Sequence, residues 1–424
     1  MLKDLQIKHW TKIVIHYIPF LILLCLLTPK SGHWGDNYAW AMWTIFNMEG
    51  GHSHIYKTGV DYMPLYHYVL HFYGKLQNST DAIHQNIYML KYITLLCEFL
   101  STLFIFKLCE DKFKNTYKAM FLSLFYLLNI GVIYNNIIWG QVDGIMAFFL
   151  IASVYFAYKK KILWTLIFYM LAINMKLQSI IFLPIVGLLL LPEILKKENI
   201  KKTILSVLIV ALMQFIILFP FIKVGDFSKV WYVVTNSVGK YKAVSVNAYN
   251  IWHILLKGNL LDINSYTEVF GLTYYLWGLI LFFISSFFAL FHFIKPLYLK
   301  IIKKVKIEFS TRKMFISCSL IPLLFFFLNT QMHERYAQTA FVFLAVYALL
   351  YNRPIPYIIG SIANFLNLEG VLKFFELGNY HTLVFMPWFV ACLFLITIIL
   401  LFFDLYDVKL KLVKTNIIEE NAAT

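Results

Sequence analysis

Charged residues are scarce in this sequence. Asp, Glu, Lys and Arg make up 14% of the 424 residues, whereas 60% of the residues are hydrophobic. A soluble domain carries about 25% charged and about 45–50% apolar residues, because its surface has to stay in water. The shortage of charge therefore excludes a soluble globule of this length. Helices that span a bilayer, each a run of about 20 apolar residues, account for the composition.

Cysteine is also rare, and its spacing excludes two further kinds of structure. None of the five cysteines forms a C-x-x-C pair, and all lie in or at the ends of apolar runs. The pattern predicts neither a disulfide framework nor a metal site. Internal repeats, low-complexity segments and a separate soluble stretch are missing too. We therefore expect residues 1–424 to form a single integral membrane domain.

The net charge of +15 comes from basic residues that lie in short clusters between apolar runs. In a soluble protein such a charge suggests nucleic acid. Between membrane helices, Lys and Arg instead mark the cytoplasmic loops, so no nucleic-acid partner is expected.

About twelve apolar runs are long enough to be treated as crossings by the length rule. The first has no small-residue cleavage site after it, so we interpret it as a membrane helix and not as a signal peptide. Every even-numbered connection is basic, which predicts an all-α polytopic protein with both ends in the cytoplasm. The predicted runs are 10–28, 84–108, 117–135, 142–158, 162–175, 177–192, 203–222, 271–294, 314–329, 335–351, 354–368 and 383–404.

The odd-numbered connections then face outward, and two of them are long, at 30–83 and 223–270. In the first, Trp40, Trp43 and Phe46 recur every three residues within 36–48. This spacing predicts an amphipathic helix lying on the membrane surface.

Polar motifs concentrate in these outward connections. In chain order they are WGDNY at 34–38, DYMPLY at 61–66, WGQVD at 139–143, KLQ at 176–178 and HERY at 333–336. Ionisable residues at membrane depth are costly and mark functional sites by default. Their gathering in alternate connections predicts one polar site on the non-cytoplasmic face.

In this order and on this side, the motifs resemble those of the GT-C glycosyltransferases. The likeness is to the dolichyl-phosphate glucosyltransferases of N-glycan assembly and to bacterial relatives of the GPI mannosyltransferases, and it covers roughly residues 30–340. Met63 departs from the second Pro that these relatives commonly have. The resemblance implies a GT-C-like fold and an inverting enzyme. Such an enzyme moves mannose or glucose from a polyprenyl phosphate to a lipid-linked glycan, or to a hydroxyl of another lipid or protein acceptor.

Inverting transfer needs a base for the acceptor hydroxyl, and the resemblance places an acid in the first outer loop. Asp36 is our candidate, with partial burial expected to raise its pKa toward the working range. Its other interpretation is the N-cap of the helix that follows. Asp143 is expected to orient acceptor hydroxyls, to be the base itself, or only to cap a helix. Asp61 either binds substrate or starts a second surface helix, with Pro64 in its first turn.

The leaving phosphate needs cations, and the candidates are Lys176, His333 and Arg335. Lys176 either binds phosphate or snorkels to the headgroups. Arg335 offers a planar fork for phosphate or pairs with Glu334. We expect the start of the following helix to add a favourable field for an anion near His333 and Arg335.

The remaining substrate-binding candidates are amides and aromatics. Gln141 and Gln178 are expected to bind sugar hydroxyls, because they stand beside the proposed acid and cation. Tyr38 and Trp139 either stack on a sugar ring or belong to the interfacial aromatic belt. No metal or other cofactor is expected, since the outer carboxylates lack ligand spacing and the nearest GT-C relatives are thought to work without one.

Two other classes of membrane protein remain open. Twelve crossings also suit a secondary transporter, or a flippase of lipid-linked sugar, although no repeat joins the two halves. A polysaccharide polymerase or ligase would share the lipid-linked substrate. Richness in Lys, Ile, Asn, Phe and Tyr suggests an AT-rich bacterial genome. We therefore expect an inner-membrane protein with its site facing the periplasm.

Overall fold

The computed structural model describes residues 2–60, 62–222, 227–236, 241–303 and 309–408, and most of this part of the chain is helical. Strands are confined to four pieces of two residues each. They are β1 (Ser245–Val246), β2 (Glu268–Val269), β3 (Leu272–Thr273) and β4 (Met332–His333).

Each of the twelve predicted apolar runs overlaps one helix or two to three consecutive helices. They are α1 (Leu2–Leu27), α6 (Leu90–Phe113), α7 (Thr116–Leu127) with α8 (Ile130–Ile133) and η3 (Tyr134–Trp139), α9 (Asp143–Tyr158), α10 (Ile162–Met175), η4 (Leu177–Phe182) with α11 (Leu183–Ile194), α12 (Ile200–Ile222), α15 (Tyr274–Lys303), α16 (Thr311–Leu328), α17 (Ala340–Tyr351), α18 (Pro354–Leu372) and α19 (Pro387–Leu405).

Within the described residues, seven helices are long and apolar enough to cross a membrane, or up to eight if the bent pair Thr116–Leu127 and Ile130–Trp139 is one span. Four further apolar helices have only 10–17 residues. A crossing needs about 20 residues, so length and composition support a multi-pass α-helical membrane protein. The count of twelve crossings stays a prediction.

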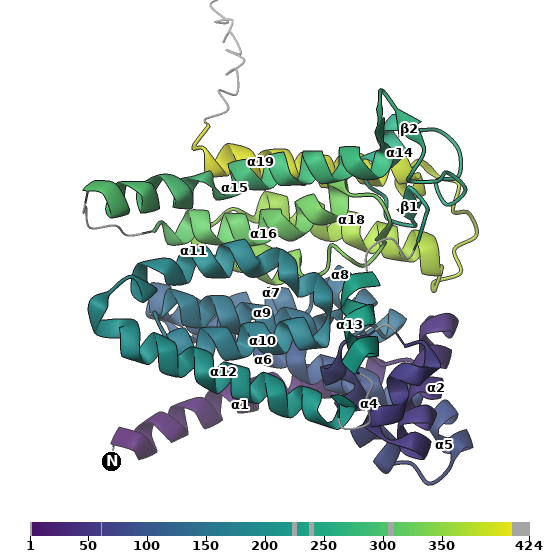
Figure 1. Ribbon diagram of the computed structural model, residues 1–424, viewed down its shortest axis with the longest axis horizontal. Coiled ribbons are helices and arrows are strands. Elements are labelled where there is room, and N and C mark those ends of the chain that lie inside the picture. The colour runs from purple at the N-terminus through teal and green to yellow at the C-terminus, as the bar shows by residue number, and fades with distance from the viewer. Residues whose placement is uncertain (1, 61, 223–226, 237–240, 304–308, 409–424) are drawn as a thin grey trace, which may run out of the picture.

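Short helices occupy the outward connections, and Figure 1 shows them gathered at one end of the bundle, opposite the N-terminus of α1. The strands β1 and β2 lie at the same end. These helices are α2 (Trp34–Gly50), α3 (His52–Ile55), η1 (Tyr56–Thr58), α4 (Pro64–Lys75), α5 (Thr80–Gln85), η2 (Ile87–Met89), α13 (Phe227–Asn236) and α14 (Trp252–Leu255).

Ion pairs tie basic connections to one another at the other end. Lys159, which follows α9, binds Asp111 near the end of α6 at 2.8 Å. Arg312 of α16 binds Asp407, which follows α19, at 2.5 Å. The alternation of polar and basic connections thus corresponds to two ends of one bundle.

Two short helices complete the described elements. They are η5 (Lys197–Asn199) between α11 and α12, and η6 (Leu383–Phe385) before α19.

The helix predicted over 36–48 is present as α2, but its aromatic stripe does not face lipid. Trp40 is only 2% exposed, and its ring meets that of Tyr66 in α4 edge-on at 5.9 Å. The ring of Trp43 meets that of Tyr62 at 5.2 Å. The apolar face of α2 therefore packs against α4. Pro64 lies in the first turn of α4 as predicted, but the helix begins at Pro64 with Met63 as N-cap and not at Asp61. The amphipathic pattern reflected burial in protein.

The centre of the bundle is formed by α16 and α17, whose residues are almost all buried. By contrast, α12 and α15 expose apolar side chains along most of their length, as expected of helices that face lipid. Strands β1 and β4 pair in parallel, which joins the long outer connection to the segment that contains His333. A rigid core therefore positions the loops at the polar end.

Candidate functional site

Asp36 lies in the first turn of α2, where three side chains hold one of its carboxylate oxygens. The indole Nε1 of Trp139 donates to Oδ2 at 2.9 Å, and Nε2 of Gln141 donates to the same oxygen at 2.6 Å. Nδ1 of His33 lies 2.9 Å from it as well. Among the described residues, Oδ1 receives no hydrogen bond, and it is therefore the oxygen left to interact with a substrate.

His33 is the N-cap of α2, so the prediction that Asp36 caps this helix is wrong. Nδ1 of His33 is 3.3 Å from the backbone N–H of Asp36 and 2.9 Å from its carboxylate. One ring nitrogen cannot accept from the first group and donate to the second. The shorter, charge-assisted contact favours a proton on Nδ1 that is donated to Oδ2.

The pKa of Asp36 runs against our expectation. Burial acts to raise it, but the hydrogen bond from His33, the charge of Arg335 and the hydrogen bond from Trp139 outweigh burial. Together they hold the pKa of the carboxyl well below its usual range. The predicted shift toward the working range is therefore wrong. Asp36 is therefore expected to be ionised at neutral pH.

Asp143 and Lys176 form a buried ion pair next to this site. Nζ of Lys176 lies 2.5 Å from Oδ1 of Asp143, and Nδ2 of Asn135 donates to Oδ2 at 3.3 Å. The two side chains are 1% and 12% exposed, so Lys176 does not snorkel to the headgroups. The N-cap of α9 is Val142, so Asp143 does not cap it either. Sequence reasoning placed both residues at the site but missed that they bind each other.

Arg335 brings the fifth outward connection to the same place. NH1 binds Glu334 at 2.7 Å, while Nε is buried and lacks a hydrogen-bond partner among the described residues. Burial opposes the charge of Arg335, but the carboxylates of Glu334 and Asp36 outweigh it and raise the pKa of the guanidinium well above its usual value. The positive charges of Arg335 and Lys176 also act on each other.

His333 belongs to β4 and lies in an aromatic setting. Its ring meets that of Tyr241 edge-on at 4.8 Å and that of Tyr336 at 5.3 Å. We predicted that the start of the following helix adds a favourable field for an anion near His333 and Arg335, and this prediction is wrong for both residues. The next helix, α17, begins only at Ala340, after a stretch of turns.

Two amides leave buried acceptor atoms at the site. Nε2 of Gln178 donates to the carbonyl of Tyr336 at 3.2 Å, just as Nε2 of Gln141 donates to Asp36. The Oε1 atom of each amide is buried without a hydrogen-bond partner among the described residues. An unsatisfied buried acceptor costs about 1–3 kcal/mol, so both atoms are suited to accept from a substrate hydroxyl.

The two predicted aromatic residues differ in their surroundings. Trp139 is only 1% exposed, and His33 stacks on its ring at 5.0 Å. It neither joins an interfacial belt nor offers a free face to a sugar, so both interpretations of Trp139 are wrong. Tyr38 is 51% exposed and stacks on Trp34, away from the donors that surround Asp36. Asp61 lies outside the described residues.

Lys91 was not predicted as a site residue, yet it hydrogen-bonds the backbone of the two segments that surround Asp36. Its side chain is 2% exposed, and Nζ donates to the carbonyls of Pro29 at 2.9 Å, Ser31 at 2.5 Å and Ile138 at 3.2 Å. Ser31 is close in sequence to His33, and Ile138 precedes Trp139. One ammonium group therefore fixes the two segments that hold the carboxylate.

We expect Lys91→Met to loosen both segments, because three carbonyls lose their shared donor. The free energy of unfolding should fall by about 1–3 kcal/mol. Faster amide hydrogen exchange at residues 31–36 and 138–141 would locate the effect. Lys30→Met, which removes an exposed lysine nearby, is the control. Equal exchange in the two variants would contradict this role for Lys91.

A second polar group missed from the sequence lies deeper, in α6. Oε1 of Glu98 accepts from Nδ2 of Asn136 at 2.5 Å, and its Oε2 is buried without a hydrogen-bond partner among the described residues. A side chain at Gly144 would collide with this carboxylate. Asn136 neighbours Asn135, so polar groups continue from Asp143 toward Glu98. The signal in the sequence was a single Glu inside an apolar run.

Asp36, Gln141, Lys176 and Arg335, which come from four different outward connections, are thus brought together at one end of the bundle. Within the described residues, no group of three or more His, Cys, Asp or Glu is placed to hold a metal ion. No family model matches the chain, and no curated protein matches it in sequence.

Proposed function

We propose that this protein is a membrane glycosyltransferase of the GT-C type. It would move a hexose from a polyprenyl phosphate to an acceptor hydroxyl at the non-cytoplasmic face. One observation carries the proposal: Trp139 and Gln141 of the second outward connection hold the Asp36 carboxylate, and the charge of Arg335 from the fifth connection acts on it. An acid and a cation from distant parts of the chain share one site.

In this proposal Asp36 is the base. Its Oδ1 accepts the proton of the acceptor hydroxyl as that oxygen attacks the anomeric carbon and the bond to the phosphate oxygen breaks. His33, Trp139 and Gln141 hold Oδ2, so Oδ1 stays fixed in direction. Preorganised polar groups of this kind do not have to reorient during the reaction.

Arg335 takes the leaving phosphate. Its Nε–H has no partner among the described residues, and a guanidinium binds phosphate oxygens in a planar, two-pronged geometry. Lys176 adds positive charge nearby, although Asp143 already engages its ammonium group. The structure therefore favours Arg335 over Lys176 for direct phosphate contact.

A transfer assay in proteoliposomes tests the proposal. Polyprenyl phosphates carrying mannose or glucose would be supplied with membrane lipids and lipid-linked glycans as acceptors. Formation of a glycosylated product together with free polyprenyl phosphate supports the proposal. Failure with every donor, in preparations where Arg335→Met does not change donor binding, would speak against it.

The pH dependence of transfer gives a further expected result. Because the pKa of Asp36 is depressed, its ionised form and the stability it contributes persist above the ordinary carboxyl value of about 3.9. Both are lost only as the pH falls through the lower value in the folded protein. We expect the acidic limb of kcat/KM to lie below about pH 4. A limb near pH 6 to 7 would assign the essential base to another group.

A second candidate function, secondary transport of a lipid-linked sugar, is favoured by one observation. Glu98 is a buried carboxylic acid within a candidate span, where proton-coupled transporters place such groups. The assay separates the two functions, because a transporter moves the donor across the proteoliposome membrane without cleaving it.

A further inference from the structure

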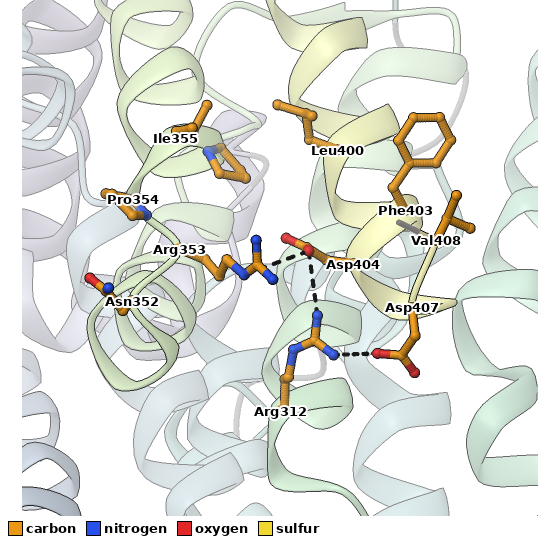
Figure 2. A pocket seen from close by; sticks show the side chains of 11 residues that line it. Arg312, Asn352, Arg353, Pro354, Ile355, Leu400, Phe403, Asp404, Asp407 and Val408 are labelled. Atoms are coloured by element: carbon orange, nitrogen blue, oxygen red, sulfur yellow. Dashed lines mark hydrogen bonds and ion pairs between the residues drawn. The ribbon is translucent and has the colours of Figure 1, made fainter. Parts of the chain in front are cut away.

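A pocket of about 680 Å³ opens at the end of the bundle opposite the candidate site. It lies between the first turn of α18 and the last two turns of α19, and Figure 2 shows Arg353 and Arg312 each joined to Asp404 by a dashed line. A volume of this size is in the range of small-molecule sites. It shares no residue with the network around Asp36.

The carboxylates of this pocket are already neutralised. Asp404 accepts from the hydroxyl of Tyr347 at 2.5 Å and from Arg312 at 3.4 Å. Asp407 binds Arg312 at 2.5 Å and Lys313 at 3.0 Å. The acidic groups therefore do not set the charge of the pocket.

Arg353 is the cation that these carboxylates engage least, through one long ion pair with Asp404. Its side chain is 58% exposed, and its nearest carboxylate oxygen, on Asp404, lies 3.9 Å from Nε, beyond hydrogen-bond distance. The helix α18 begins one residue later, and its dipole adds partial positive charge to that of Arg353, but Pro354 and Pro356 have no N–H to donate, so Arg353 is the main hydrogen-bond donor for a phosphate here. Lys112 lies over the ring of Tyr351 at 3.8 Å, so it adds positive charge close to the segment that precedes Arg353.

The walls of the pocket change from charged to apolar toward the interior of the bundle. On α19, Leu400 lies one turn before Asp404, and Phe403 lies near the end of the helix, after which Asp407 follows. On α18, Ile355 follows Arg353 and is 60% exposed. A ligand lying along both helices would meet a cation at the surface and apolar side chains below it.

We propose that this pocket binds an anionic phospholipid of the surrounding leaflet. The phosphate would lie against Arg353 and the N-terminus of α18, and an acyl chain would follow Leu400 and Ile355. The positive charge at the surface of the pocket matches the anionic headgroup of such a lipid, and the apolar side chains below it match the acyl chain. Phosphatidylcholine, whose headgroup carries no net charge, lacks the electrostatic part of this match. The inference does not depend on the proposed enzymatic function.

Native mass spectrometry of the full-length protein tests the site, with phosphatidylglycerol and phosphatidylcholine of the same chain length as probes. The wild type should retain phosphatidylglycerol preferentially. Arg353→Gln should weaken this retention about fivefold, since one Arg near the surface contributes about 1 kcal/mol, and should leave phosphatidylcholine unchanged. Arg353→Lys should restore most of the effect.

Lys197→Gln is the matched control, because it removes an exposed basic residue from another connection at the same end. Equal retention in Arg353→Gln and wild type, or an equal loss in Lys197→Gln, would overturn the proposal. Displacement of the lipid by inorganic phosphate would make the pocket a site for free anions. Photolabelling the unmodified protein with a diazirine lipid should mark residues 353–356 or 400–408, and labelling only elsewhere would exclude the pocket.

Discussion

Replacing Asp36 by Asn is expected to lower the rate of sugar transfer by about 10²–10⁴, the contribution typical of general acid–base catalysis. The amide keeps the volume of the side chain and one acceptor oxygen for Trp139 and Gln141, but it takes no proton from the acceptor hydroxyl. Donor binding should change little, because Arg335 is untouched. Turnover and donor affinity would be measured separately on the purified protein.

The control is Glu49→Gln, which neutralises an exposed carboxylate near the other end of the same helix. It should leave turnover unchanged. Full activity in Asp36→Asn would exclude Asp36 as the base. If Asp143→Asn, tested under conditions where its unfolding curve shows that it is folded, were inactive in the same experiment, the base would be assigned to Asp143.

Breaking the pair of Asp143 and Lys176 is expected to have the largest effect on stability. A buried charge left without its partner costs about 3–5 kcal/mol, and each of these side chains is largely shielded from solvent. Lys176→Met and Asp143→Asn should each lower the free energy of unfolding by roughly that amount. The double variant should be less destabilised than the sum of the two, because neither charge then remains.

Lys196→Met provides the comparison, since Lys196 binds Glu193 at 2.7 Å but its side chain is 39% exposed. An exposed pair contributes only about 0–1 kcal/mol. Denaturant unfolding in one detergent would measure all four variants. Similar losses for Lys176→Met and Lys196→Met would show that the Asp143 pair is not shielded as the structure indicates.

The positions of the helices could be predicted because a bilayer-spanning helix needs a long apolar run, and such runs are visible without any tertiary contact. The alternation of basic and polar connections similarly separated the two ends of the bundle. It correctly brought Asp36, Asp143, Lys176 and Arg335 to one end. Both predictions depend on one-dimensional properties of the chain.

The partners within the site could not be predicted, because they depend on the approach of segments distant in sequence. Trp139 looked like an interfacial aromatic, and only its contact with Asp36 shows that it is a buried donor. Lys91 looked like a basic residue near a helix end, yet it binds three carbonyls. The low pKa of Asp36 follows from such contacts, whereas burial alone predicted the opposite shift.

The pairing of β1 with β4 has a consequence for how the protein is made. Residues of the polar end come from segments as far apart as His33 and Tyr336, so their contacts close very long loops. During synthesis, Asp36 would emerge long before Arg335, and the network would stay open until α16 had been inserted. A chain that stops before β4 would have an incomplete site, so we expect activity to appear in one step, late in biogenesis.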